Sequence, residues 1–236
     1  MAKTRLLLSV AGICAFLISG VFAQRIACGA PANNGKTNLV PNPGFEETDA
    51  EGNLAGWDLN GKNAVCCRID TKDAASGRYS LRITRLDDQG PPSAAFIGLS
   101  ELIPVEPGTG YTLSFYTKFE PETQVSSSFT SPMFVEVWWY NEKKERLSTL
   151  WTQQGIPDGY NKGRVGILAG KGFSDWGRFC TEITTKPEAH YAKIWLARYQ
   201  SKGSTWYDDV QFEKGNEPSP FKFEPPKTYH EPKYAW

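Results

Sequence analysis

Short runs of alternating apolar and polar residues, separated by clusters of Gly, Pro, Asn and Asp, constrain this chain most strongly. Successive side chains of a β-strand point to opposite faces, so the alternation is typical of strands, and we find no clear helical period. Many short strands with such turns predict one large all-β domain, a sandwich of antiparallel sheets. The predicted strands lie at 79–83, 95–102, 111–119, 133–140, 177–184, 191–198 and 206–212, with shorter candidates at 39–46 and 56–59.

Two segments interrupt this pattern. Residues 148–175 form a long link that is rich in Gly and polar residues, and links of this length are usually functional or mobile. The tail at 216–236 is rich in Pro, which neither continues a sheet nor begins a helix easily. We expect the tail either to lie across the sandwich as an extended strap or to be disordered.

The first residues are typical of a secretory signal peptide. Lys3 and Arg5 precede an apolar run at 6–22, and small residues lead to a break after Ala23. A transmembrane anchor is the alternative, but the run is short for a membrane span. We therefore expect a signal peptide at 1–23, a lead-in at 24–37, and a secreted or extracytoplasmic protein with no membrane insertion after cleavage.

Four cysteines remain after such a cleavage, and in an exported chain they favour disulfides over metal binding. No C-x-x-C spacing, which is common at zinc sites, is present. Adjacent cysteines rarely pair with each other, so we expect Cys28 to pair with one of Cys66 and Cys67, and Cys180 to pair with the other. Which of the two joins which stays open.

The charge balance excludes some partners. The chain has 26 basic and 26 acidic residues, and without a cluster of Lys and Arg it offers no electrostatic footprint for nucleic acid. Its aromatic residues are abundant, but a large core uses many of them, so their number alone does not indicate binding.

The alternation also predicts the direction of particular side chains. On their strand, Glu136, Trp138 and Tyr140 face out, between residues expected in the core. On another strand, Lys193 and Trp195 face out in the same way. Two strands therefore each expose a Trp beside a charged residue, and exposed apolar surface of this kind often marks an interaction site.

One predicted strand carries two acids, "YDDV", although Asp is depleted in strands. If Val210 and Phe212 face the core, Asp208 faces it as well and Asp209 faces out. A carboxylate that faces inwards needs a charge partner or strong hydrogen bonds. The sequence therefore predicts a partner for Asp208.

The stretch "NLVPNPGFEE" at 38–47 and seven later stretches resemble the CenC-like carbohydrate-binding modules, a group that includes families four, nine, sixteen and twenty-two. "NLVPNPGFEE" at 38–47 is similar to their first strand. The resemblance covers residues 38–215 and implies a jelly-roll β-sandwich of two antiparallel sheets, galactose-binding-like, that binds a polysaccharide or oligosaccharide. The other matching stretches, in the expected order, are "GW" (56–57), "ASGRYSLRI" (75–83), "VEPGTGYTLSFYTK" (105–118), "VEVWWYNEKKERL" (135–147), "WGRFCTEIT" (176–184), "AKIWLARY" (192–199) and "WYDDVQFEKG" (206–215).

Many such modules hold a structural calcium between the first and last strands, and the resemblance implies Glu46 and Asp208 as its carboxylates. Backbone carbonyls of the loop that begins at Ser76 would complete the shell, since calcium takes about six to eight oxygen ligands. Asp209 is the ligand instead if the register slips at a bulge. The alternative is that Asp208 accepts hydrogen bonds from backbone amides or pairs with Arg78.

Sugar rings present an apolar C–H face that an exposed Trp or Tyr covers, while polar groups bind the hydroxyls. The resemblance places the ligand on an outer sheet face, although these Trp residues could instead pack beneath loops or the tail. It stays open whether the two Trp-bearing strands share a sheet, which glycan binds, and whether binding is at chain ends or internal stretches. The candidate residues are Trp138, Trp195, Tyr116, Tyr140, Glu136, Lys193, Arg198 and Gln200.

Two other functions remain open. The sandwich can serve as a secreted adhesion or assembly module, with the Pro-rich tail as a docking peptide. Jelly rolls also include polysaccharide lyases and glycoside hydrolases, and glycosidases need two carboxylates that face one bond. We find no such arrangement, and His190 and His230 lie in no recognisable constellation. Binding without catalysis is therefore the favoured hypothesis, and a hydrolase acting on glycosyl bonds is the enzymatic alternative.

Overall fold

The computed structural model describes residues 35–59, 66–85, 94–120, 133–147, 164–167, 173–199 and 203–235. This part of the chain contains ten strands and no α-helix, so no helix within it is long and apolar enough to cross a membrane. The strands are β1 (Cys67–Asp70), β2 (Ser80–Arg85), β3 (Ala94–Gly98), β4 (Ile103–Pro104), β5 (Gly110–Phe119), β6 (Met133–Tyr140), β7 (Arg164–Ile167), β8 (Phe173–Thr184), β9 (Tyr191–Tyr199) and β10 (Gly203–Lys214).

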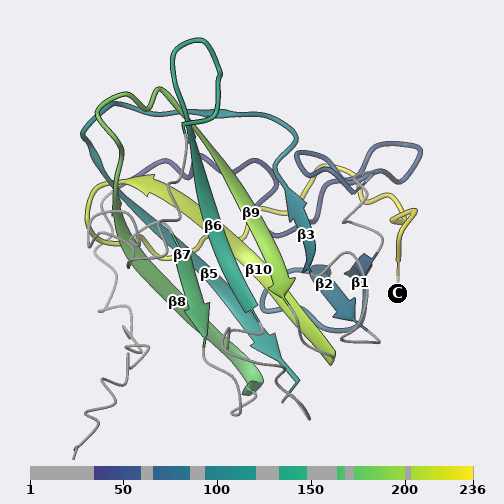
Figure 1. Ribbon diagram of the computed structural model, residues 1–236. Helices are drawn as coiled ribbons and strands as arrows, with labels where there is room; N and C mark the ends of the chain where they lie inside the picture. Colours follow the sequence, from purple (N-terminus) through teal and green to yellow (C-terminus); the bar gives the residue numbers. More distant parts are fainter. Residues whose placement is uncertain are drawn as a thin grey trace, which may run out of the picture.

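The strands form two sheets that pack face to face as a jelly-roll sandwich (Figure 1). Sheet 1 has the strand order β1-β2-β10-β5-β8, and sheet 2 has the order β3-β9-β6-β7 with β4 also beside β9. Every pair of neighbouring strands is antiparallel. The predicted fold class is confirmed.

The predicted strand pattern matches most of the observed strands. Each of the seven longer predictions overlaps one of β2, β3, β5, β6, β8, β9 and β10. The strands β1, β4 and β7 were missed, β7 because it lies inside the irregular link. The candidate at 39–46 is not a strand. There Asn42 and Phe45 have positive φ angles of 45° and 60°, a left-handed conformation that interrupts an extended chain.

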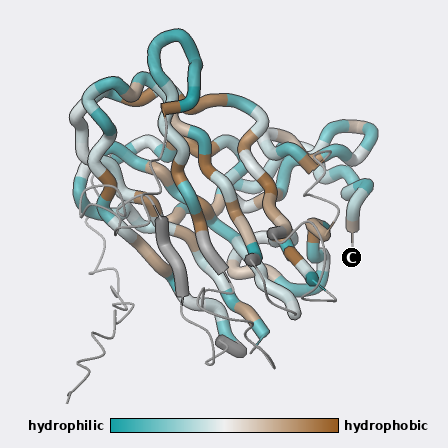
Figure 2. The backbone as a smooth tube through the Cα atoms, in the orientation of Figure 1, coloured by the Kyte–Doolittle hydropathy of each residue, from teal (hydrophilic) through white to brown (hydrophobic). Residues whose placement is uncertain are grey.

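The core lies between the sheets and follows the alternation of apolar residues. Figure 2 shows hydrophobic and hydrophilic residues alternating along the strands. Leu113 and Phe115 of sheet 1 and Ile194 and Leu196 of sheet 2 are fully buried. The Tyr207 hydroxyl donates a 2.6 Å hydrogen bond across the core to the carbonyl of Ala197, which ties the central strand of sheet 1 to sheet 2.

The Pro-rich tail lies across the molecule, and we call residues 216–235 the strap. Near its start, the Ser219 amide donates to Glu213 of β10 over 2.9 Å. Near its end, Tyr234 accepts a 2.9 Å hydrogen bond from the amide of Ile69 in the edge strand β1. Tyr229 packs edge-on against Tyr79 with ring centroids 6.0 Å apart. Of the two alternatives, the extended strap is the observed one.

Candidate functional site

Two neighbouring strands of sheet 2 bring the predicted tryptophans together. β6 and β9 pair directly, with Glu136 opposite Trp195 and Trp138 opposite Lys193. The indole rings of Trp138 and Trp195 therefore lie diagonally across the strand pair, with centroids 4.6 Å apart and planes inclined by 41°. The structure answers the open question of the sequence: both strands lie in one sheet, and both rings lie on its outer surface.

We call this surface the aromatic face. Diagonal neighbours on a sheet are close enough for large rings to touch, and the alternation that exposes Trp138 exposes Tyr140 as well. Tyr191 pairs with Tyr140 in the same register, and Phe96 of β3 packs edge-on against Trp195 at 5.2 Å. The aromatic face is formed by Phe96, Trp138, Tyr140, Tyr191 and Trp195.

The two indole rings are held by different contacts. The Trp138 Nε1 donates a 3.0 Å hydrogen bond to the carboxylate of Glu136. Trp195 lies against Gly98 of β3, where an added Cβ would come within 2.7 Å of the ring, so glycine permits this close approach. The Trp195 Nε1 is buried and has no hydrogen-bond partner. An unpaired buried donor is costly, so a ligand or a shift of the ring that satisfies it would be favoured.

A tight turn after β6 returns the chain over the aromatic face. The amide of Asn141 donates to the carbonyl of Glu145, and Arg146 comes to lie opposite Tyr140. Lys144 has a positive φ of 62° within this turn. The Arg146 guanidinium lies 3.4 Å above the centroid of Trp138.

Two lysines make similar contacts with rings of the aromatic face. The Nζ of Lys193 lies 4.9 Å from the Trp195 ring centroid, and the Nζ of Lys144 lies 5.6 Å from that of Tyr191. Each is within the range of a cation–π contact. Burial raises the pKa of the Tyr140 hydroxyl, which the charge of Arg146 partly offsets.

Some predicted sugar-binding residues lie elsewhere. Arg198 is fully buried between the sheets, where it donates to the Thr205 hydroxyl over 2.6 Å, so its predicted place beside the ligand is wrong. It continues the inward alternation of β9. Tyr116 lies on the outer surface of sheet 1, near Arg178, and is therefore remote from the aromatic face. Gln200 lies outside the described residues.

Sequence reasoning missed several residues of this region, among them Phe96, Tyr191, Lys144 and Arg146. The alternation that exposes Trp195 also predicts an outward Tyr191, and the same period applied to β3 would have found Phe96. Arg146 had no comparable signal, because its position depends on how the turn folds back.

Asp208 and Asp209 do not point as the simple alternation predicts. Asp208 pairs with Tyr116, on the outer surface of sheet 1, whereas its neighbour Tyr207 points into the core. The register shifts between Asp208 and Gln211, and Asp209 has a positive φ of 50°. The prediction that Asp208 faces the core is therefore wrong. A β-bulge inserts an extra residue before Val210, so the alternation counted back from Val210 assigns Asp208 to the wrong face of the sheet.

Both acids are nevertheless buried, because loops cover them. The Asp208 carboxylate accepts hydrogen bonds from the amides of Ala75 and Ser76, and the Ser76 hydroxyl donates to Asp209 over 2.7 Å. Glu46 accepts 2.7 and 2.8 Å bonds from the amides that follow in the same loop, at positions 78 and 79. One loop thus joins the N-terminal segment to β10. We call Glu46, Ser76, Asp208 and Asp209 the acidic clasp.

Burial disfavours the ionised form of the carboxylates in the acidic clasp. Burial raises the pKa of Asp208 well above its usual range, and the charge of Asp209 adds to this rise. Burial likewise raises the pKa of Asp209 and that of Glu46. The second carboxylate oxygen of Glu46 is buried without a hydrogen-bond partner. This oxygen is therefore suited to act as a ligand of a cation.

The side chains of the acidic clasp do not form a complete coordination shell for a metal ion by themselves. Within the described ranges there is no group of three or more His, Cys, Asp or Glu side chains that could hold a metal ion. A calcium ion would therefore need backbone carbonyls as well. A cavity of about 400 Å³ lies beside the clasp, lined by Glu46, by Gln211 and Glu213 of β10, and by the strap.

The disulfides predicted for Cys66 and Cys67 are absent. Cys66 and Cys67 are both free thiols, so neither is joined to Cys180 or to Cys28 as predicted. Cys180 is disulfide-bonded, and Cys28 lies outside the described residues. Cys67 points into the core, where burial raises the pKa of its thiol, so its packing rather than its reactivity explains its position.

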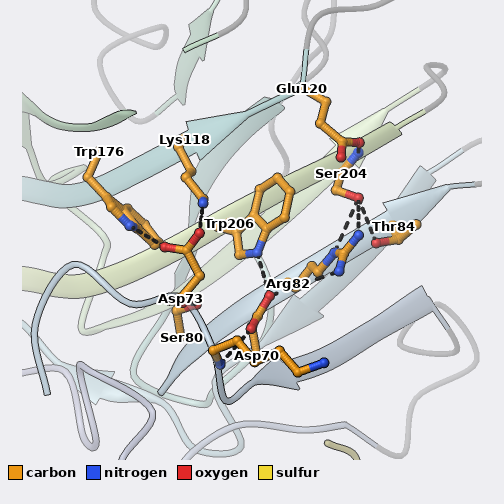
Figure 3. A network of polar contacts seen from close by, with 11 residues as sticks. Asp70, Asp73, Ser80, Arg82, Thr84, Lys118, Glu120, Trp176, Ser204 and Trp206 are labelled. Atoms are coloured by element: carbon orange, nitrogen blue, oxygen red, sulfur yellow. Dashed lines mark hydrogen bonds and ion pairs between the residues drawn. The ribbon is translucent and has the colours of Figure 1, made fainter. Parts of the chain in front are cut away.

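The outer surface of sheet 1 carries a second group of tryptophans and charges (Figure 3). Trp206 lies between two cations, with Arg82 at 4.8 Å and Lys118 at 4.6 Å from its ring centroid. Asp70 accepts a 2.8 Å bond from Trp206 Nε1 and lies 4.0 Å from Arg82. We call this group, completed by Asp73 and Trp176, the charged network.

A two-sheet jelly roll with tryptophans side by side on one outer face has the architecture of a carbohydrate-binding module. Residues 37–152 match the protein family described as "Carbohydrate binding domain". The family resemblance of the sequence is confirmed over these residues.

Other similarities are more distant. The chain is 25% identical over 183 residues to the tRNA nuclease WapA of Bacillus subtilis strain 168, which covers 76% of this chain but only 7% of WapA. Among solved structures, it is similar to a family 16 carbohydrate-binding module, with 17% identity, 74% of this chain and 99% of that chain covered, and a TM-score of 0.45. A family 61 module in complex with β-1,4-galactotriose gives 17% identity, coverage of 76% and 99%, and a TM-score of 0.45.

Proposed function

We propose that this protein is a secreted, non-catalytic carbohydrate-binding module that binds a polysaccharide on the aromatic face and carries a structural calcium in the acidic clasp. The observation that carries the proposal is the contact between the rings of Trp138 and Trp195 on adjacent strands, with ring centroids 4.6 Å apart. The family match at residues 37–152 supports a glycan as the ligand. The signal peptide predicted at 1–23 supports secretion.

The contacts on the aromatic face suit a sugar polymer. Each indole offers an apolar surface to the C–H groups of a sugar ring, and a ring held by its sheet neighbours loses little entropy on binding. Glu136, Lys193 and Tyr140 lie among the rings and provide hydrogen-bonding groups for hydroxyls. Their mixture of apolar area and few polar groups is typical of small-ligand sites.

Calcium in the acidic clasp would act on the fold and not on the sugar. Glu46, Asp208 and Asp209 would supply carboxylate oxygens, and the loop that begins at Ser76 would supply carbonyls. A bound divalent ion would compensate the negative charges of the buried carboxylates, and it would hold the N-terminal segment against β10. The aromatic face lies on the opposite sheet, so we expect the ion to affect binding only through stability.

A pull-down with insoluble and immobilised polysaccharides tests the binding function. The folded protein should be retained by at least one glycan, and retention should be lost in Trp138→Ala. Trp176→Ala removes a partly buried Trp from the other sheet and serves as the matched control. A well-folded protein that no glycan retains would refute the proposal. Release of reducing sugar or unsaturated product, abolished by Glu136→Gln, would show that the protein is instead an enzyme.

A further inference from the structure

The cations of the aromatic face lack acidic partners. Arg146, Lys193 and Lys144 each lie over a ring, and none of these three side chains has a hydrogen bond or an ion pair with the described residues. Cations elsewhere in the protein do find such partners: Lys118 pairs with Asp73 and Lys214 with Glu106. Three cations that lack such partners therefore lie together on this face.

Among the described residues, the acids near the aromatic face form no ion pair with these cations. Glu136 accepts the bond from Trp138 Nε1. In the turn, Glu145 accepts a 2.8 Å bond from the Asn141 side chain and so holds the turn itself. The remaining acid of the turn, Glu142, is exposed and has Lys143 beside it in the chain. The positive groups over the rings are thus left for a ligand.

The three cations extend along the strands rather than around one point. Lys144 lies at Tyr191 and Lys193 at Trp195, and these two rings are four residues apart on β9. With a rise of about 3.3 Å per residue, the cations span roughly 13 Å along the sheet. That length exceeds one sugar ring, so the arrangement suits repeated negative charges along a polymer.

We propose that the polysaccharide bound by the aromatic face is acidic and that its uronate carboxylates pair with Arg146, Lys193 and Lys144. This inference rests on the proposed function. A neutral sugar stacked on Trp138 must displace the guanidinium that lies 3.4 Å above the ring. An acidic sugar offers that group a carboxylate at its edge, and the planar guanidinium binds carboxylates through two parallel hydrogen bonds.

Matched polymers that differ only in charge test this proposal. Binding of the full chain to polygalacturonate, alginate and hyaluronan is compared by affinity electrophoresis with binding to their methyl esters, in which the carboxylates are neutralised. We expect at least one acid form to bind at least tenfold more tightly than its ester. Binding of that form should weaken as the salt concentration rises, because salt screens exposed charges.

Two double variants identify the cations responsible. Arg146→Gln with Lys193→Gln should reduce the preference for the acid form to less than threefold. The control, Lys72→Gln with Lys227→Gln, removes the same charge from exposed positions on the side of sheet 1 and the strap, and it should retain the preference. Loss of preference in both double variants would assign the effect to net charge and overturn the proposal.

The outcomes separate this inference from the proposed function. Equal binding of acid forms and esters, or binding of neutral glycans alone, would overturn the acidic ligand and leave the carbohydrate-binding function standing. Binding of a sulfated galactan such as carrageenan, but of no uronate polymer, would overturn the assignment to carboxylates. Failure to bind any charged or neutral glycan would overturn both.

Discussion

The outer surfaces of the two sheets contain the same kinds of residues but differ in how these residues are partnered. In the charged network of sheet 1, Asp73 accepts a 2.9 Å bond from Trp176 and also pairs with Lys118. Trp206 is only 8% exposed, and its indole N–H is bonded to Asp70. On the aromatic face of sheet 2, the cations have no acidic partners and Trp195 has an unpaired N–H.

This comparison shows that residue types alone do not mark a binding surface. A Trp beside a Lys or Arg stabilises the fold when a carboxylate of the same chain completes the set. The same pair is available to a ligand when no carboxylate pairs with the cation, as at Trp138, whose N–H is bonded to Glu136 while Arg146 above its ring has no acidic partner in the described part of the chain. The two surfaces therefore differ in whether their cations and indole N–H groups have partners within the chain, and the predictions below test this difference.

The largest expected effect is on stability, from Trp206→Ala in the charged network. Removal of a large buried side chain typically costs about 3–5 kcal/mol, and here the carboxylate of Asp70 also loses its donor. Trp138→Ala, at a half-buried position, should cost clearly less. Urea denaturation of both variants measures the difference, and equal losses would contradict the contrast between the two surfaces.

The next largest effect concerns the acidic clasp. Adding a chelator should lower the melting temperature and restoring calcium should raise it again, since an ion that binds only the folded state stabilises it by about 2.7 kcal/mol at a hundredfold excess over its Kd. Glu46→Gln should abolish this response. Glu136→Gln makes the same change on the aromatic face and should keep it. An unchanged melting temperature in verified metal-free protein would exclude a structural calcium site.

A smaller effect is expected on glycan affinity from Trp195→Ala. Truncation of a central aromatic contact commonly costs about 2 kcal/mol or more in binding, which is over tenfold in Kd. Trp176→Ala, on the charged network, should change Kd by less than about twofold. Isothermal titration with the best-binding glycan provides the measurement. A reversed order of the two variants would place the binding surface on sheet 1.

The smallest effect is expected from Asp73→Asn. The change removes the charge that pairs with Lys118, and partly exposed ion pairs contribute only about 0.2–1 kcal/mol. The amide oxygen can still accept the bond from Trp176. Thermal melts compare the variant with the parent. The small difference in melting temperature at low salt should vanish at high salt, whereas a loss of several kcal/mol would show that the network is more strongly coupled than its exposure suggests.

Much of the architecture could be predicted from local pattern. The alternation along β5, β6 and β9 identified the core residues, and it placed Trp138 and Trp195 on outer surfaces. It was less informative where the backbone leaves the regular pleat. The bulge at Asp209 reversed the direction of Asp208, and the left-handed residues Asn42 and Phe45 replaced an expected strand by a turn.

The sequence by itself determined which residues alternate and hence which sides of each strand are apolar, because the period of two is a property of the extended chain. Only the tertiary structure decided which strands are neighbours, and thus that Trp138 meets Trp195 while Tyr116 lies on the other sheet. It also decided that Arg146 lies over a ring and Arg198 lies in the core. Those positions depend on pairings between distant segments, which the local alternation does not specify.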